Sequence, residues 1–112
     1  MKRGDVVTIA FPQSDGQIKH RPAILLKQIP PFDDWVVCPV STQLRHEIPG
    51  VDLLINSNHP DFAAMGLKKD SVIRVAKLYA VPSREIRGVI GAMNPSTFEG
   101  LIRQLTNWLE SE

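Results

Sequence analysis

Apolar residues over most of the chain fall into short runs with the composition of β-strands. Valine, isoleucine and aromatic residues dominate positions 5–11 and 35–40, where they partly alternate with polar residues. Proline, glycine and a pair of aspartates separate such runs at short intervals, which favours an all-β barrel or sandwich core. Further strands are predicted at 22–27, 51–55, 70–81 and 88–92, of which 70–81 is the longest.

The end of the chain changes to helical spacing. One apolar stripe recurs there at intervals of three and four residues: Phe98, Leu101, Ile102, Leu105, Trp108 and Leu109. Asn94 is a suitable N-cap, and Pro95 suits the first helical position, where its missing N–H is not needed. We therefore predict a C-terminal amphipathic helix that packs on the β-structure.

Length and composition indicate a single globular domain over residues 1–112. The chain is 43% hydrophobic and 22% charged, which is ordinary for a soluble domain. It has no apolar stretch of membrane-spanning or secretory length, so we expect no membrane partner. Cys38, the single cysteine, is predicted to be a buried, unreactive thiol in a reducing, cytoplasmic setting. The formal net charge is only +1, so any nucleic-acid role must depend on a local basic patch.

Several kinds of catalytic site are missing from the sequence. His20, His46 and His59 lack metal-ligand spacing with one another or with Cys38. The chain has no phosphate-binding loop, no dinucleotide fingerprint and no serine in a nucleophile elbow. Any chemistry is therefore expected to use basic and hydroxyl side chains, with no metal and no organic cofactor.

One group of basic and hydroxyl residues meets that requirement. Arg21 precedes Pro22, which favours extended geometry, and its planar guanidinium suits a phosphate. Ser41 and Thr42 end another predicted strand with two hydroxyls, and Arg74 adds a second positive charge. Motifs this short are weak evidence for a site. Charge and spacing alone therefore favour a purely structural interpretation, in which the two arginines are solvated charges at strand ends and Ser41 and Thr42 open a turn.

Segments spread over nearly the whole chain resemble a known family. In order they are 3–7 (RGDVV), 11–12 (FP) with 15–16 (DG), 21–25 (RPAIL), 36–42 (VVCPVST), 70–74 (DSVIR) and 90–91 (IG), followed by the helix. Taken together they resemble the PemK/MazF-type toxins of bacterial type II toxin–antitoxin pairs. No single segment is decisive, and the ordered set carries the resemblance.

The resemblance implies a fold, an activity and roles for particular residues. The fold is mainly β with a C-terminal helix, a small SH3-like β-barrel similar to that of the CcdB toxins and usually homodimeric. The activity is metal-independent cleavage of single-stranded RNA by attack of the ribose 2′-OH on the adjacent phosphate. By position, Arg21 matches the family's catalytic arginine and Arg74 a second arginine. Ser41 matches the family's hydroxyl position, with Thr42 beside it.

The sequence departs from the family where a carboxylate is common. Many relatives carry an acid two residues after the position of Arg74, and this chain has Ala76. The general base is therefore open, with His20 and Asp15 as the candidates.

RNA contacts are expected mainly from the loop that leads into Arg21. Gln13 and Gln17, together with His20, are placed to read base edges. Asp15, Lys19 and Lys77 complete the predicted RNA-binding residues.

The resemblance also implies a protein partner, a cognate antitoxin whose disordered segment folds onto the toxin. Two other functions stay open on the same fold. A gyrase inhibitor would act through protein contact and leave RNA intact, and a non-catalytic barrel would bind nucleic acid without cleaving it. The pairing of Arg21 with Ser41 favours the nuclease, whereas Ala76 keeps the non-catalytic alternative open.

Overall fold

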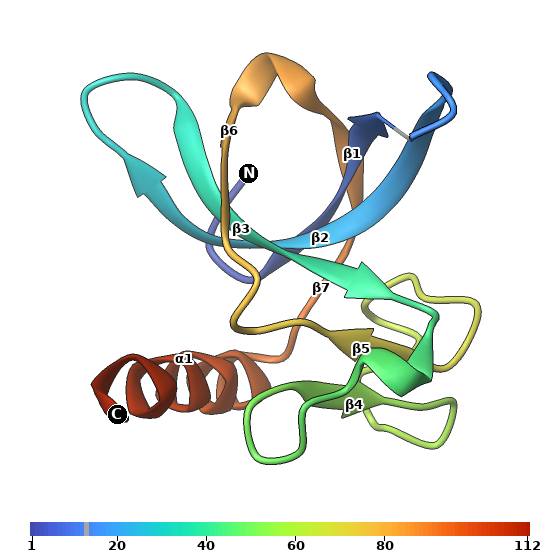
Figure 1. The fold of residues 1–112 in the computed structure, drawn as a ribbon, viewed down its shortest axis with the longest axis vertical. Helices are drawn as coiled ribbons and strands as arrows, with labels where there is room; N and C mark the ends of the chain where they lie inside the picture. Colours follow the sequence, from blue (N-terminus) through green and yellow to red (C-terminus); the bar gives the residue numbers. More distant parts are fainter. Residues whose placement is uncertain (13) are drawn as a thin grey trace.

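The computed structural model describes residues 1–12 and 14–112. Within them the chain forms a β-sheet and one α-helix, joined by turns and two short 3₁₀ helices (Figure 1). The elements in chain order are β1 (Asp5–Pro12), β2 (Ile18–Ile29), β3 (Asp34–Ser41), η1 (Leu44–His46), β4 (Leu53–Ile55), β5 (Ser71–Ile73), β6 (Tyr79–Pro82), η2 (Ser83–Glu85), β7 (Ile86–Ala92) and α1 (Pro95–Glu110). No helix in these residues is long and apolar enough to cross a membrane.

The strands pair antiparallel, with β3 in the middle of the sheet (Figure 1). Their order is β4-β5-β3-β2-β1-β7, and β6 also pairs with β3. The prediction of a mainly β fold with a C-terminal helix is confirmed. The hydrogen-bonded sheet does not close into a complete barrel, because β4 and β7 at its two ends do not pair within the described residues.

β2 begins earlier than predicted, and this places Arg21 inside a strand. The sequence predicts a strand only from position 22, since the residues before it are polar. In the structure β1 pairs with β2 along its whole length, with Ile9 opposite Arg21 and Ala10 opposite His20. The neighbouring strand supplies backbone partners to these polar residues, so the hairpin extends beyond the apolar pattern.

The prediction of one long strand at 70–81 is wrong. The chain forms β5 and β6, both paired with β3 and separated by a turn at residues 74–78, which we call the 74–78 turn. On β3, only Cys38 and Pro39 separate the residues that pair with β6 from those that pair with β5. On the opposite segment, the five residues 74–78 separate the end of β5 from the start of β6. The excess residues leave the sheet and form the turn.

Pro39 explains why the strand breaks at this point. In an antiparallel strand the N–H and C=O of one residue point toward the same neighbour. The carbonyl of Pro39 accepts a hydrogen bond from the N–H of Arg74 at 2.9 Å, but Pro39 has no N–H to donate in return. The ladder therefore stops at Arg74, and the chain turns before it pairs with β3 again.

The core contains two apolar clusters. One includes Ile24 on β2 and Leu101 on α1, and the other is built around Trp35 on β3. Cys38 lies in the first cluster, where burial, and then the negative charge of Asp52, raise the pKa of its thiol to about 12. The prediction of a buried, unreactive thiol is confirmed.

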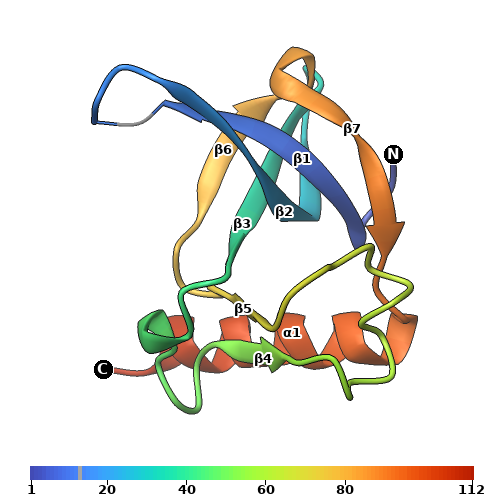
Figure 2. The same ribbon diagram turned by 90° about the vertical axis from the view of Figure 1, so that its right-hand side faces the viewer.

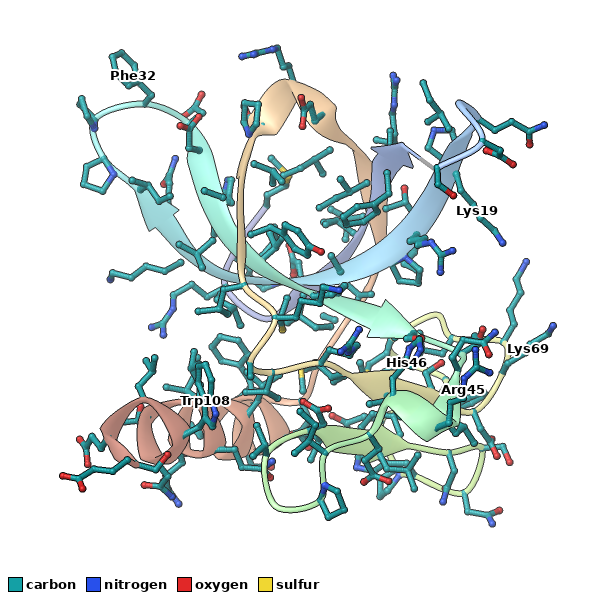
Figure 3. The ribbon with its side chains drawn as sticks, viewed as in Figure 1. Lys19, Phe32, Arg45, His46, Lys69 and Trp108 are labelled. Atoms are coloured by element: carbon teal, nitrogen blue, oxygen red, sulfur yellow. The ribbon has the colours of Figure 1, made fainter. Side chains whose placement is uncertain are left out.

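α1 lies beside β4 and β5 at one end of the molecule (Figure 2). It starts as predicted, because the side chain of Asn94 accepts a hydrogen bond at 3.1 Å from the backbone N–H two residues on, and Pro95 follows at the first position. Leu101 is fully buried at the middle of the stripe. Trp108 and Leu109, at the end of the predicted stripe, are exposed (Figure 3).

The buried carboxylate of Asp52 ties together segments that are distant in sequence. One of its oxygens accepts the backbone N–H of Ile48 at 2.9 Å, and the other accepts that of Val75 at 3.0 Å. The side-chain amide of Gln104 on α1 donates to the backbone carbonyl of Asp52 at 3.2 Å. Asp52 therefore fixes the loop after η1, the turn between β5 and β6, and the helix relative to one another.

We expect Asp52→Ala to lower the free energy of unfolding by about 2–4 kcal/mol, because it leaves two backbone N–H groups without their acceptor. Urea denaturation measures the change. Asp70→Ala is the matched control, since Asp70 is exposed and accepts one backbone N–H, that of Ser57 at 2.9 Å. Its loss is expected to stay below about 1 kcal/mol. Equal losses for the two variants would contradict the central role of Asp52.

Candidate functional site

A cavity of about 290 Å³ opens beside the end of β3. We call it the basic cavity. It is lined by Phe11, Arg21, Pro39, Val40, Ser41, His46, Arg74, Lys77 and Tyr79. Among the described residues, three cationic side chains and no carboxylate form its lining, although the whole chain has a net charge of only +1.

Arg21 reaches the basic cavity from β2. It is half-buried, whereas the neighbouring His20 is exposed and does not line the cavity. Successive side chains on a strand point to opposite faces, so a residue adjacent to Arg21 points away from the face that Arg21 uses. Lys19, farther along the β1–β2 hairpin, is also exposed and lies outside the lining (Figure 3). The structure therefore does not bring the predicted base His20 to this cavity.

Ser41 is the last residue of β3 and is buried at the cavity wall. Its Oγ accepts a hydrogen bond from the backbone N–H of Gln43 at 3.0 Å, which fixes the side chain. The hydroxyl proton stays available to donate to a ligand. Thr42 is exposed and does not line the cavity, so the two adjacent hydroxyls do not act as a pair here.

Arg74 enters the basic cavity from the turn between β5 and β6. The turn is closed by a hydrogen bond from the N–H of Lys77 to the carbonyl of Arg74 at 3.1 Å. The side-chain Nε of Arg74 is buried and has no hydrogen-bond acceptor within the part of the chain that the structure describes. Buried donors in proteins are nearly always paired, so this one is available to a water molecule or a ligand. A bound anion would supply both the acceptor and the opposite charge.

His46 is a cavity residue that the sequence did not single out. It ends η1, beside Arg45 (Figure 3). Its Nδ1 lies 3.5 Å from Ser41 Oγ, at the outer limit of a hydrogen bond. Desolvation of the half-buried ring, and then the positive charges of Arg74, Arg45 and Lys77, lower the pKa of His46 below its ordinary value. This direction of the shift favours the neutral form of the imidazole, which is the form that can accept a proton.

Two aromatic side chains complete one wall. Phe11 and Tyr79 form an edge-to-face pair, with ring centroids 5.6 Å apart and planes inclined at 64°. Both line the cavity, and Tyr79 is partly exposed. Their exposed ring surface is suited to contact with an unstacked base. Neither residue was predicted for the site, because strand composition alone does not separate a cavity wall from the core.

Other residues predicted for RNA binding lie outside the basic cavity. Asp15 and Gln17 are exposed on the β1–β2 hairpin, where Asp15 accepts the backbone N–H of Gln17 at 2.9 Å. Neither residue lines the cavity, so Asp15 is not placed as its base. Gln13 lies outside the described residues. Lys77 is the one member of the predicted RNA-binding set that contributes to the lining.

A second and larger cavity, of about 650 Å³, lies between the N-terminal residues and α1. Its Arg3 is already engaged, since the guanidinium lies 5.3 Å from the ring centroid of Phe98 and Nε donates to the carbonyl of Leu26 at 2.8 Å. Glu99 adds a negative charge to its lining. We place the chemistry in the smaller basic cavity, because its cations, hydroxyl and imidazole converge there with no carboxylate to neutralise them.

The chemistry that the basic cavity supports is binding of a phosphate group. Arg21, Arg74 and Lys77 offer positive charge, and Ser41 offers a hydroxyl donor. The described residues contain no group of three or more histidine, cysteine or acidic side chains that would hold a metal ion. The arrangement therefore suits a phosphodiester held by protein cations.

Comparison with known proteins identifies the family. The chain matches, over residues 2–109, the family model described as PemK-like, MazF-like toxin of type II toxin–antitoxin system. Because the match spans nearly the whole chain, the protein belongs to this family of toxins. A search among curated proteins returned no match.

Solved structures of MazF-type toxins share the fold. The Mycobacterium tuberculosis toxin MazF-mt6 superposes with a TM-score of 0.69 at 22% identity, covering 96% of this chain and 98% of that one. A MazE–MazF structure from Deinococcus radiodurans gives a TM-score of 0.74 at 15% identity, covering 100% and 97%. An endoribonuclease in complex with its cognate antitoxin, from a mycobacterial species, gives 0.72 at 13% identity, covering 100% and 97%. The mainly β fold with its C-terminal helix is that of the MazF structures.

The environment of His46 makes a testable prediction. Arg74→Gln removes the positive charge that most lowers the pKa of His46 after desolvation, so we expect that pKa to rise toward its ordinary value. NMR titration of the imidazole ring protons measures it. Arg103→Gln, on the exposed side of α1, removes the same charge outside the basic cavity and should leave the pKa of His46 unchanged. An unchanged or lower pKa in Arg74→Gln would show that the guanidinium does not face the ring.

Proposed function

We propose that this toxin is a metal-independent endoribonuclease that cleaves single-stranded RNA in the basic cavity. The observation that carries the proposal is the convergence of Arg21, Arg74 and Lys77 on one cavity that has no carboxylate in its lining. Such a cavity attracts a negatively charged phosphodiester and disfavours binding of a metal cation. RNA is the substrate whose own 2′-OH provides the nucleophile, so no other nucleophile is needed.

Each polar side chain has a role in this reaction. Arg21 and Arg74 stabilise the negative charge that grows on the phosphoryl oxygens as the 2′ oxygen attacks. The hydroxyl of Ser41, fixed by the N–H of Gln43, donates to one of those oxygens. The products are a 2′,3′-cyclic phosphate and a 5′-hydroxyl. We assign Thr42 no contact with the reacting atoms, since it is exposed.

Substrate contacts outside the cavity are proposed for the β1–β2 hairpin. Lys19 and His20 are exposed on β2, the strand that carries Arg21, and the exposed Gln17 directly precedes it. They are free to contact nucleotides on either side of the cleaved bond. Gln13 and Asp15 of the same loop stay in this proposal as sequence-based candidates.

The partners follow from the same family relationship. A structural relative is described as an endoribonuclease bound to its cognate antitoxin, and we propose an antitoxin partner for this chain as well. We also propose a homodimer. Val89 and Ile90 are large exposed apolar residues on β7, at one end of the sheet, and a second copy would cover them. An RNA substrate and an antitoxin partner favour action in the cytoplasm.

Cleavage of a long single-stranded RNA in EDTA tests the proposal. We expect the purified protein to release fragments with 5′-hydroxyl ends, and Arg21→Ala to lower the cleavage rate by about 10²–10³-fold. Arg103→Ala on α1 is the matched control and should cleave at the wild-type rate. Intact RNA at every concentration of the wild-type protein would reject the nuclease and leave a binding function.

Binding without cleavage gives an independent test of the phosphate contacts. A single-stranded DNA oligonucleotide lacks the 2′-OH and cannot react. Removal of one phosphate contact in Lys77→Gln should reduce the slope of log K against log salt by about 0.7. Lys27→Gln, an exposed lysine outside the basic cavity, should leave the slope unchanged. A slope that changes equally in both variants would argue against a localised site.

A further inference from the structure

We propose that His46 is the catalytic base that accepts the proton of the ribose 2′-OH. The inference rests on the proposed ribonuclease function and adds the residue that the reaction otherwise lacks. The position where many family members carry an acid is Ala76 here. Among the described residues that line the basic cavity, His46 is the only histidine, and imidazole is the side chain whose ordinary pKa lies closest to neutral pH.

The fold holds His46 at a fixed position relative to the phosphate-binding arginines. His46 ends η1, and two residues later the N–H of Ile48 is bound to Asp52 at 2.9 Å. The other oxygen of Asp52 holds the N–H of Val75, next to Arg74, at 3.0 Å. One buried carboxylate therefore holds both the segment that carries the base and the segment that carries the cation, and both residues line the same cavity.

The proposed step uses the imidazole tautomer in which Nδ1 carries the proton and faces Ser41. Its Oγ already accepts the N–H of Gln43, and it has a second lone pair for the Nδ1–H of His46, 3.5 Å away. In that tautomer Nδ1 is the donor and Nε2 carries the lone pair. The Ser41 hydroxyl proton then stays free for a phosphoryl oxygen. A single serine thus orients the base and contacts the substrate without competing for the same lone pair.

The reaction step balances with these groups and water. Nε2 of His46 takes the 2′-OH proton while the bond from the 2′ oxygen to phosphorus forms and the bond from phosphorus to the 5′ oxygen breaks. The departing 5′ oxygen takes a proton from water. The imidazolium then returns its proton to the hydroxide that is left. No oxidant, metal or further reactant is required.

The charges around the ring suit a base. The charges that lower the pKa of the ring are those of Arg74 and Lys77 in the turn between β5 and β6 and of Arg45 in η1, and all three are positive. Arg21 lines the same cavity, and the carboxylate nearest in sequence is that of Glu47. The positive charges lower the proton affinity of the ring, which favours its neutral form before substrate binds. A bound phosphodiester offsets part of this positive charge. The proton affinity of His46 therefore rises when the substrate is in place, which is when the base is needed.

His20 does not meet these conditions. It is exposed, lies outside the lining of the cavity, and neighbours Arg21 on a strand where adjacent side chains face opposite ways. His20→Ala is therefore the matched control for His46→Ala. Both variants remove one imidazole, but only one removes it from the basic cavity.

The experiment measures RNA cleavage against pH for wild type, His46→Ala, His46→Gln and His20→Ala. We expect kcat/KM to fall about 10²–10⁴-fold in both His46 variants, with loss of the acidic limb of the pH profile. Added imidazole should restore part of the rate in His46→Ala, where it leaves space, and not in His46→Gln. His20→Ala should keep the wild-type profile. Unchanged affinity for a DNA oligonucleotide verifies that the variants are folded.

Two outcomes separate failure of this inference from failure of the proposed function. A wild-type protein that cleaves RNA, together with His46 variants that keep its rate and its acidic limb, would overturn the role of His46 and leave the nuclease intact. A wild-type protein that leaves RNA uncut would instead reject the proposed function itself. Loss of rate in His46→Ala with an unchanged acidic limb and no rescue by imidazole would show a structural role and would also overturn the inference.

Discussion

The basic cavity depends on one interaction, the pair of backbone hydrogen bonds that the buried carboxylate of Asp52 accepts. Its donors, the N–H groups of Ile48 and Val75, belong to two segments that carry His46 and Arg74. Neither segment can move without leaving a buried polar group unpaired, which is costly. Two turns of irregular backbone thereby gain the rigidity that a site needs in order to hold reacting groups in place.

The fold could be predicted from the sequence where local chemistry decides it. The start of α1 at Asn94 is such a case, since the N-cap and the following proline act within one turn. Where pairing decides, the pattern was insufficient. Residues 19–21 are polar, yet they form a strand because β1 lies beside them. The strand predicted at 70–81 breaks because Pro39, far earlier in the chain, cannot donate to it.

The functional site, too, could be predicted from the sequence only in part. Resemblance to the family singled out Arg21, Ser41 and Arg74, and the structure brings all three to one cavity. No spacing rule could have found His46, because it sits in a loop with no periodic relation to β3 and reaches Ser41 through the bend of η1. His20 was the more obvious histidine for its place beside Arg21. Adjacency on a strand is the reason that it faces elsewhere.

The missing acid at Ala76 has consequences for both charge and proton transfer. A carboxylate in the turn between β5 and β6 would place a negative charge near Arg74 and Lys77 and would neutralise part of their positive charge. Without it, the Nε of Arg74 is left with no acceptor in the described residues, and the positive charges act on His46 unopposed. With Ala76 in the turn, these positive charges favour a bound phosphate and shift the pKa of His46 downward. The base is then supplied from the loop after β3 instead of from the turn.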